Sequence, residues 1–354
     1  MLKKLLILLV CVAVLVAAGT GLWAWQGLQT LKAPVALTEP LLFKVPHGAS
    51  FSATARRMED EGLVADSLWL RLYGRAVPEQ SRIRAGEYEF QPGMSALDMV
   101  ASMVRGDVKQ WQVRIIEGWT FHDMREALAR SEHLAHKTRD WTDDDIMKAV
   151  GAEGEHPEGR FFPDTYLYTG GDTDLDVLKR AYQRMSTVLA EQWQNRADGL
   201  PYETPYEALI MASIVERETG VPEERNEVAG VFVRRLQKGM RLQTDPTVIY
   251  GMGDDYQGGI TLRDLKTYTP YNTYRINGLP PTPIALPGKG AIHAALHPDD
   301  GNALYFVARG DGTHQFSATL KAHQQAVRQF QLNRRDDYRS APPPDTTNTG
   351  EAAP

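Results

Sequence analysis

The sequence predicts an α+β protein with three parts: an N-terminal transmembrane helix, a small α+β subdomain and a larger α+β domain. Three observations support this prediction. The N-terminus carries a long uncharged run, a strand–turn–helix pattern recurs between residues 41 and 130, and the length of 354 residues suggests about two domains. Short strands and helices that follow each other in this way indicate a mixed fold.

The composition excludes several classes of protein. Charged residues make up 24% of the chain and the formal net charge is −6, so no binding to nucleic acid is expected. Cys11 is the only cysteine, which excludes an intramolecular disulfide and a cysteine-rich metal site. The chain contains no H-E-x-x-H motif, and its histidines have no recognisable ligand spacing. We therefore predict no metal and no cofactor.

The first 25 residues are typical of a membrane-spanning helix. Two lysines precede the uncharged run Leu5–Trp25, which is long enough to cross a bilayer at about 20 residues. The run ends in two tryptophans that suit the membrane interface, and the lysines favour a cytoplasmic N-terminus. The alternative is a cleaved signal peptide that ends near Gly19, but the apolar region of such peptides is usually only about 7–15 residues long.

This interpretation predicts a single-pass protein of the cell inner membrane. Residues 1–25 would form the cytoplasmic tip and the transmembrane helix, and residues 26–40 a linker. The rest of the chain, including any catalytic domain, would lie in the periplasm.

Residues 41–107 are predicted to form the small subdomain. “LLFKVPHGAS” indicates a strand and a turn, and “SFSATARRMEDEGLV” an amphipathic helix with Ser50 or Ser52 as its N-cap. “AGEYEFQPGMSALDMVASMVRG” indicates a second strand, a Pro-Gly turn and a helix capped by Ser95. “WQVRIIEGWTFHDMREALA” then repeats the order of strand, turn and helix, which fits either an ordinary α+β arrangement or an internal duplication.

Residues 108–338 are predicted to form the larger domain. A helix-rich stretch runs to Gly199, and “ALYFVA” is typical of a buried strand that leads into the hairpin turn “RGDG”. The segment Arg339–Pro354 lacks the apolar residues that could offset the entropy lost on ordering, so a disordered tail is predicted there.

Two glutamates at the end of an apolar run are the first candidates for chemistry. Residues 206–215 predict a buried helix, and Glu216 and Glu218 fall in its last turn. The negative end of the helix dipole and the apolar surroundings both raise the pKa of a carboxyl group. A glutamate that is protonated at neutral pH can donate its proton to a glycosidic oxygen. The alternative is a frayed helix end paired with Arg217 or Arg225, and the residues alone leave both interpretations open.

A second polar cluster follows this helix. “FVRRLQKGMRLQTDPTVIYG” and “YNTYRINGLPPTPIALPG” combine tyrosines, amides and arginines. Tyrosine rings and amides suit a hydroxyl-rich ligand in an extended groove, and the arginines could bind carboxylates on that ligand. A loop whose tyrosines pack on the core would explain the same residues equally well. Asp245 precedes a proline and is expected in a turn, where its side chain would cap Thr247 or Val248.

Several long motifs resemble the YceG-like family. They are “EGRFFPDTYLYT”, “MASIVERETG”, “ERNEVAGVFVRRLQKGMRLQTDPTVIYGMG”, “YNTYRINGLPPTPIALPG” and “HPDDGNALYFVARGDGTHQFSATLKAH”, and they occur in the family's order. The resemblance extends from about Leu41 to Tyr338. It implies a lyase, an endolytic peptidoglycan lytic transglycosylase that cleaves the MurNAc–GlcNAc β-1,4 bond within nascent glycan strands. The muramyl 6-hydroxyl would attack its own anomeric carbon and leave a 1,6-anhydro end, which would terminate strand elongation.

The resemblance also implies roles for parts of the chain. Glu218 matches the family's catalytic acid, and Glu216 would be structural. Residues 41–107 resemble a LysM-like part, where contact with glycan is implied. The implied partners are peptidoglycan glycan strands, the inner membrane and peptidoglycan synthases. The matched positions that are expected in the substrate groove are Gln243, Asp245, Thr247, Tyr271, Asn272, Tyr274 and His314.

Two other functions fit the sequence. A hydrolytic muramidase could use Glu218 together with Asp245, because most glycoside hydrolases need two carboxylates. A non-catalytic protein anchored in the membrane could instead bind the cell wall.

Overall fold

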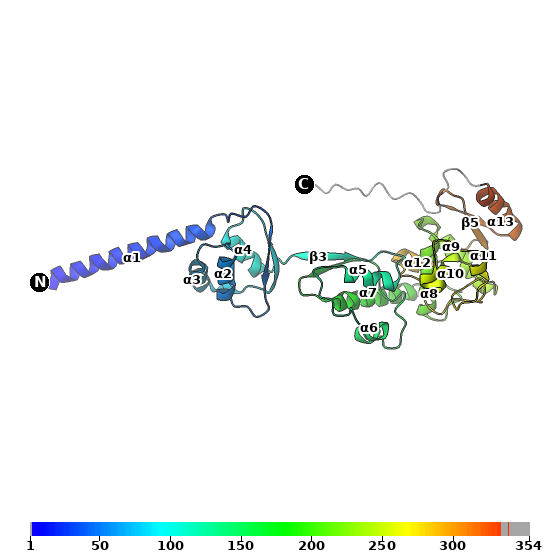
Figure 1. Ribbon diagram of the computed structural model, residues 1–354, viewed down its shortest axis with the longest axis horizontal. Coiled ribbons are helices and arrows are strands. Elements are labelled where there is room, and N and C mark those ends of the chain that lie inside the picture. The colour runs from blue at the N-terminus through cyan, green and yellow to red at the C-terminus, as the bar shows by residue number, and fades with distance from the viewer. Residues whose placement is uncertain (1, 334–338, 340–354) are drawn as a thin grey trace. The chain divides into compact units, whose positions relative to one another are not determined.

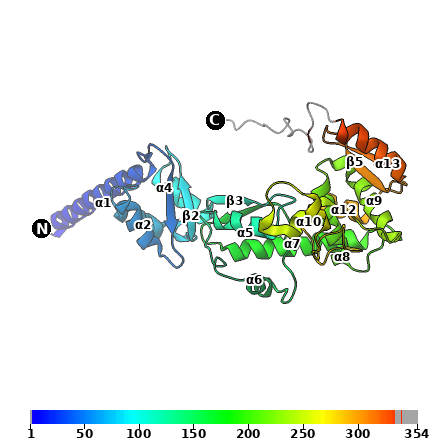
Figure 2. The ribbon, with the colours of Figure 1, turned by 45° about the vertical axis from the view of Figure 1, so that its right-hand side comes forward.

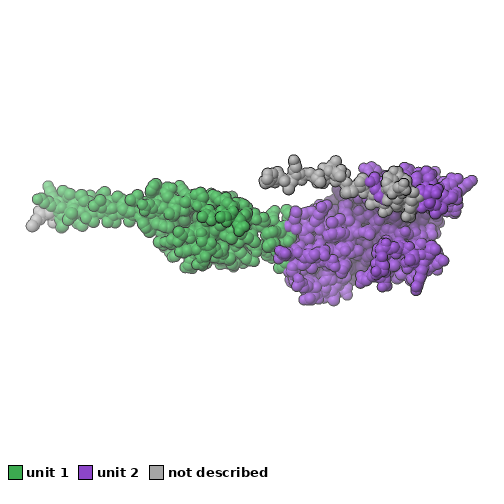
Figure 3. Space-filling view, turned by 45° about the horizontal axis from the view of Figure 1, so that its top comes forward, with its two compact units in different colours: residues 1–111, 133–135, 167–172 green, residues 112–132, 136–166, 173–354 purple. Residues whose placement is uncertain are grey.

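The computed structural model describes residues 2–333 and residue 339. It combines helices with small sheets, so the predicted α+β class is confirmed. The chain forms two compact units (Figure 3), of which the first ends at Trp111 rather than at residue 107 and also includes residues 133–135 and 167–172. The second unit holds the other residues after Trp111. The predicted disordered tail, Arg339–Pro354, lies outside the described residues except for Arg339.

Helix α1, Leu2–Lys32, is the N-terminal helix of the first unit (Figure 1). In the part of the chain that the structure describes, it is the one helix that is long and apolar enough to cross a membrane. Its side chains from Leu5 to Trp25 are exposed, as a lipid-facing segment requires. The predicted N-terminal helix is therefore present, and its length and composition suggest a single-pass membrane anchor.

Helix α1 continues to Lys32 and so includes the first part of the predicted linker, residues 26–40. The last turns of α1 bury one face instead of running free. Leu31 is only 3% exposed and packs in the core of the first unit. Gly27 lies against the ring of Trp69, which a Cβ atom at this position would overlap.

The rest of the first unit packs short helices against a two-stranded antiparallel sheet. Strand β1, Leu41–Val45, pairs with β2, Gly86–Phe90, and Phe43 lies opposite Tyr88 in this register. Both of these aromatic side chains are fully buried and form the centre of the core. The helical segments are α2 (Phe51–Asp60), α3 (Ser67–Ala76), η1 (Pro78–Ser81) and α4 (Ala96–Arg105).

Two predicted helix caps of this unit are confirmed. The Ser50 side chain accepts a hydrogen bond from Ala53 N at 3.2 Å at the start of α2. Ser95 forms a capping box with Asp98 at the start of α4. Each cap satisfies backbone N–H groups that the first helical turn leaves without a partner.

The repeated order of strand, turn and helix that “WQVRIIEGWTFHDMREALA” predicts is also confirmed. Strand β3, Gln110–Arg114, pairs with β4, Thr165–Thr169, in a separate two-stranded sheet. Gly118 has a φ of 81° in the turn that follows, a conformation that glycine adopts readily. Helix α5, Phe121–Ala129, begins after this turn.

The second unit is built around helix α8, Pro205–Glu218. Every side chain from Ala208 to Val215 is buried, and α8 packs against α7, α9, α10 and α12 (Figure 2). A helix that is apolar on all sides is expected at the centre of a core, so the predicted buried helix is confirmed. The other helical segments of this unit are α6 (Asp143–Val150), α7 (Asp174–Gln194), η2 (Pro222–Glu224), α9 (Arg225–Gln237), α10 (Asp245–Met252), η3 (Gly253–Asp255), α11 (Leu262–Lys266), α12 (Lys289–Leu296), α13 (Leu320–Val327) and η4 (Arg328–Leu332).

A hairpin completes the second unit. Strands β5, Tyr305–Ala308, and β6, His314–Ser317, pair antiparallel, and α13 packs against both. In the turn between them, Arg309 N donates a hydrogen bond to Thr313 O at 2.8 Å, and two glycines adopt positive φ. The predicted hairpin turn at “RGDG” is therefore confirmed.

Candidate active site

The two glutamates lie in the last turn of α8, as predicted. Thr219 leaves the helix in an extended conformation with φ −138° and ψ 130°. The helix therefore ends at Glu218. Because α8 is buried along most of its length, its last turn is held firmly in the unit.

The carboxylate of Glu216 is held by neighbouring segments of the protein. Its side chain is only 6% exposed, Oε2 accepts a hydrogen bond from Gly288 N at 2.9 Å, and Oε1 lies 3.5 Å from Nη2 of Arg225. The adjacent Arg217 donates instead to Gly118 O at 2.9 Å. Of the two ion pairs considered for the helix end, the one with Arg225 is present, and it involves Glu216.

The carboxyl group of Glu218 has a different environment. Burial raises its pKa from 4.5 to about 7, and the charge of Asp245 acts in the same direction. A short hydrogen bond donated by the Thr244 hydroxyl and the charge of Arg235 oppose this rise. At neutral pH the group is consequently divided between its acid and its carboxylate forms, as an acid–base catalyst requires.

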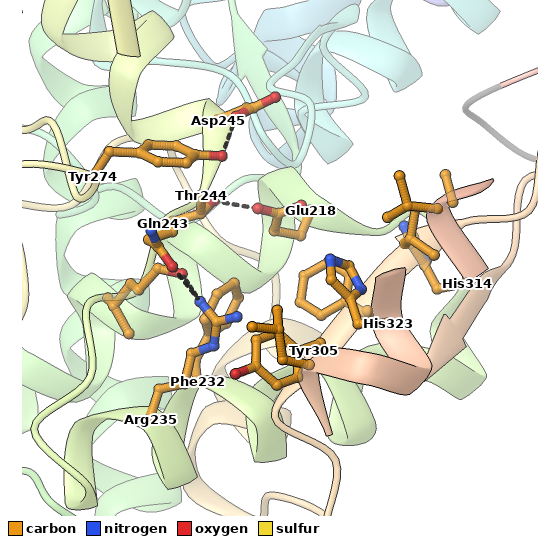
Figure 4. Close-up of a pocket in the computed structure, with 16 residues that line it drawn as sticks. Glu218, Phe232, Arg235, Gln243, Thr244, Asp245, Tyr274, Tyr305, His314 and His323 are labelled. Carbon is orange, nitrogen blue, oxygen red and sulfur yellow. Dashed lines mark hydrogen bonds between the residues drawn. The ribbon is translucent and has the colours of Figure 1, made fainter. Parts of the chain in front are cut away.

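Glu218 lines a pocket of about 480 Å³ within the second unit (Figure 4). Polar side chains of the loop before α10 lie on one side, and the β5–β6 hairpin with α13 lies on the other. The lining residues are Glu218, Phe232, Arg235, Leu242, Gln243, Thr244, Asp245, Tyr274, Tyr305, Phe306, Val307, Ala308, His314, Leu320, His323 and Val327.

The loop before α10 has an unusual backbone conformation. Gln243 has a φ of 54° and is the one non-glycine residue with positive φ among the described residues. Such a conformation is uncommon for residues other than glycine and is often found at functional sites. Gln243 N donates to Thr273 O at 3.3 Å and Thr244 N donates to the Thr273 hydroxyl at 3.1 Å, which holds the loop in this conformation.

Asp245 differs from the prediction. It is the first residue of α10 rather than part of a turn, and no side chain caps this helix. Its Oδ1 accepts a hydrogen bond from the Tyr274 hydroxyl at 2.6 Å, so the expected cap on Thr247 or Val248 is wrong. Asp245 is exposed in the pocket wall.

The structure brings together four of the residues that were expected in the groove. Gln243, Asp245, Tyr274 and His314 line the pocket with Glu218 (Figure 4). They come from two loops, from the start of α10 and from β6, so residues that lie far apart in the sequence meet around one carboxyl group.

The other three expected residues do not line this pocket. Thr247 and Asn272 are fully buried, which corrects the expectation that their side chains face a groove. The Thr247 hydroxyl donates to Thr244 O at 2.7 Å, and Asn272 Nδ2 donates to Thr267 O at 2.6 Å, so both side chains bind backbone instead. The Tyr271 hydroxyl shares a hydrogen bond of 2.9 Å with Thr282.

Sequence reasoning missed two glutamates that hold other parts of the second unit. Glu224 holds His314, because Oε1 accepts from His314 N at 2.8 Å and Oε2 lies 2.7 Å from Nδ1. Glu158 is only 4% exposed and accepts hydrogen bonds from Phe121 N and the Tyr250 hydroxyl, while burial raises its pKa to about 7. Glu158 is the first residue of the motif “EGRFFPDTYLYT”, so the sequence contained a signal for it. No local sequence pattern links Glu224 to His314, which lies 90 positions further along the chain.

No cluster of acidic, histidine or cysteine residues that could hold a metal ion occurs in residues 2–333 or at residue 339.

Comparisons with known proteins agree with the motifs. The sequence profile of the YceG-like family matches residues 43–329. The endolytic murein transglycosylase of Bacillus subtilis (strain 168) is 29% identical over 308 residues, which cover 81% of this chain and 83% of that protein. The endolytic murein transglycosylase of Streptococcus pneumoniae (strain D39) is 27% identical over 303 residues, which cover 75% of this chain and 53% of that protein.

A solved structure is similar as well. The crystal structure of a YceG-like protein from Listeria monocytogenes has 29% sequence identity and a TM-score of 0.51, and the match covers 81% of this chain and 99% of that chain. The fold and the family match therefore agree over most of the sequence, and this chain belongs to the YceG-like family.

Proposed function

We propose that this protein is an endolytic peptidoglycan lytic transglycosylase and that Glu218 is its catalytic acid and base. The observation that carries the proposal is the Glu218 carboxyl group, which lines a pocket and has a pKa raised by burial to about 7. The family membership and the names of the relatives support the same activity.

In the proposed reaction, protonated Glu218 donates its proton to the glycosidic oxygen between MurNAc and GlcNAc. The bond between that oxygen and the muramyl C1 breaks, and the muramyl O6 forms a bond with C1. The proton of the 6-hydroxyl passes to the Glu218 carboxylate, which restores the acid. The reaction consumes no water, and a tethered hydroxyl provides a high effective molarity.

We further propose that the polar residues around the pocket bind the sugar units. Gln243, Asp245, Tyr274 and His314 offer amide, carboxylate, hydroxyl and imidazole groups to the hydroxyl and acetamido groups of the glycan. Thr247, Tyr271 and Asn272 would act indirectly, by holding the two loops that carry these side chains.

A hydrolytic muramidase is the second candidate, and one observation favours it. Asp245 is exposed and lines the same pocket as Glu218, so it could activate a water molecule. Its hydrogen bond from Tyr274 favours a positioning role in the lytic mechanism instead.

The membrane helix leads to a proposal about the cell. We propose that α1 anchors the protein in the inner membrane with its N-terminus in the cytoplasm, and that the rest of the first unit and the second unit work in the periplasm on nascent glycan strands beside peptidoglycan synthases. A LysM-like unit over residues 41–107 would add a contact with glycan to that of the catalytic domain, residues 108–338, and cleavage would terminate strand elongation.

The orientation can be tested with protease on spheroplasts. We expect protease added from outside to degrade the chain after α1, because it would lie beyond the outer end of this helix, while a tag before Lys3 stays protected. Protected units, or a soluble form that begins near Gly19, would contradict a retained anchor.

Substitution should separate the two glutamates. Glu218→Gln keeps the size of the side chain but cannot donate a carboxylic proton, so we expect turnover of glycan strands to fall by about 10²–10⁴-fold while binding persists. Glu216→Gln is the matched control, since an amide can still accept the hydrogen bond from Gly288 N, and it should keep substantial activity. The reverse order of the two effects would assign catalysis to Glu216.

The pH dependence should follow Glu218. The acid form starts the reaction, so kcat/KM should fall as the pH rises above about 7, the pKa to which burial raises this group. Thr244→Val removes the hydrogen bond that lowers this pKa and should move the decline to higher pH. Glu216→Gln should leave the decline where it is. A decline centred near the ordinary carboxyl pKa would show that another group is the acid.

The products should distinguish lysis from hydrolysis. Digestion of glycan strands in ¹⁸O-water should leave the new muramyl ends unlabelled, because O6 rather than water attacks C1, and mass spectrometry should find 1,6-anhydro rings. Early products should be oligosaccharides of mixed length. A parallel digest with a hydrolytic muramidase serves as the labelled control, and ¹⁸O in reducing ends of our product would return Asp245 to the role of second catalyst.

A further inference from the structure

Three arginines lie in the last turn of α9 or shortly after it, and two of them have partners that explain their presence. Arg234 Nε donates to Ala303 O at 2.8 Å and Nη1 to Asp299 O at 2.6 Å. Arg241 donates to Asn277 Oδ1 at 3.2 Å and to Tyr274 O at 3.0 Å. Both side chains therefore connect loops of the second unit.

The third arginine, Arg235, differs in its partners. Its Nε donates to Leu304 O at 2.7 Å, and its Nη1 donates to Leu242 O at 2.8 Å, with a long contact of 3.5 Å to Gln243 Oε1. All of these acceptors are neutral oxygens. Among residues 2–333 and residue 339, no carboxylate forms an ion pair with Arg235, and its Nη2 has no hydrogen-bond partner.

This lack of a counter-ion is costly because Arg235 is only 8% exposed. Buried charges are usually paired, since removing a cation from water is unfavourable unless an anion compensates for it. Arg235 nevertheless lines the pocket of Glu218, and its guanidinium group lies 5.1 Å from the centre of the Tyr305 ring (Figure 4). Although Nη2 has no hydrogen-bond partner, the protein does not enclose it, so the atom is accessible from the pocket.

The two acidic residues that line the pocket, Glu218 and Asp245, are not close ion-pair partners of Arg235. Asp245 Oδ1 accepts its hydrogen bond from Tyr274, and Glu218 is bonded to the Thr244 hydroxyl. Neither carboxyl group lies within 4.0 Å of the guanidinium group, the limit for an ion pair. A ligand that carries an anion would therefore give the guanidinium group the close ion pair that it lacks.

We propose that Arg235 forms a carboxylate subsite beside Glu218, which binds an acidic group of the branch that each muramyl residue carries. The proposal rests on the proposed function. The sugar rings of a peptidoglycan strand are neutral, whereas the lactyl group on the muramyl O3 carries a peptide with free carboxylates, or is itself a carboxylate where the peptide has been removed. A guanidinium group suits a planar carboxylate better than an ammonium group does.

The test compares three glycan substrates on the full-length protein in detergent, in a Glu218→Gln background so that only binding is measured. The first carries native peptides, the second has all carboxylates converted to neutral methylamides, and the third has lost its peptides to an amidase and exposes the lactyl carboxylate. We expect the native strands to bind about tenfold more tightly than the amidated strands, as one charge-assisted hydrogen bond would allow. Tight binding of the third substrate would identify the lactyl carboxylate as the group that Arg235 binds. Weak binding of this substrate would identify the carboxylates of the peptide instead.

Arg235→Gln should abolish the difference between native and amidated strands. Arg234→Gln is the matched control, because it changes the neighbouring arginine on the same helix, and it should keep the difference. A merely structural role of Arg235 would weaken the binding of all three substrates equally. That result would overturn the proposal. Equal binding of native and amidated strands by the protein with Arg235 intact would overturn it as well, and this comparison does not depend on the stability of any Arg235 variant.

These outcomes are separate from those of the proposed function. Loss of carboxylate discrimination would leave the lytic mechanism in place as long as 1,6-anhydro ends are formed. Hydrolytic products with retained discrimination would leave the subsite in place and change only the reaction.

Discussion

The site depends on the burial of the central part of helix α8. Every side chain from Ala208 to Val215 is buried, and the helix packs against four others. Its one buried hydroxyl, on Ser213, donates to Ile210 O at 2.7 Å and accepts from Ile284 N at 3.0 Å, so it also ties the helix to the segment before α12. A helix that is held in this way cannot shift without exposing apolar surface, and its last turn therefore keeps Glu218 in a constant position.

Two loops complete the site through a buried network of hydroxyl groups. Thr247 and Thr273 share a hydrogen bond of 2.8 Å, and Thr244 N donates to the Thr273 hydroxyl. This network compensates for the strained backbone of Gln243 and aims the Thr244 hydroxyl at Glu218. Preorganised groups of this kind need not rearrange during a reaction, which is a large source of catalytic power in enzymes.

Glu216 and Glu218 show how different the surroundings of two carboxyl groups in one helical turn can be. Burial raises the pKa of Glu216, and a backbone N–H group and an arginine oppose this rise. Burial also raises the pKa of Glu218, to about 7, and its hydrogen-bond donor is a hydroxyl group in the wall of the pocket. Two residues of the same type, two positions apart, therefore have different partners, and only Glu218 lines the pocket.

The sequence by itself determined the features that depend on local patterns. The uncharged run predicts α1, the apolar run predicts α8, serines predict the caps of α2 and α4, and the motif around Glu218 identifies the family. Each of these follows from residues that lie within a few turns of one another. The end of α1 was missed because Leu31 is buried by a segment outside that local window.

Tertiary structure decided which side chains face the pocket. Thr244 lies 26 positions from Glu218, Gly288 lies 72 positions from Glu216, and His314 lies 90 positions from Glu224. Asn272 and Tyr274 belong to the same polar segment, yet one is buried against backbone carbonyls and the other lines the pocket. Residue type alone cannot separate these outcomes, because hydrogen bonds to a distant backbone and hydrogen bonds to a ligand require the same chemical groups.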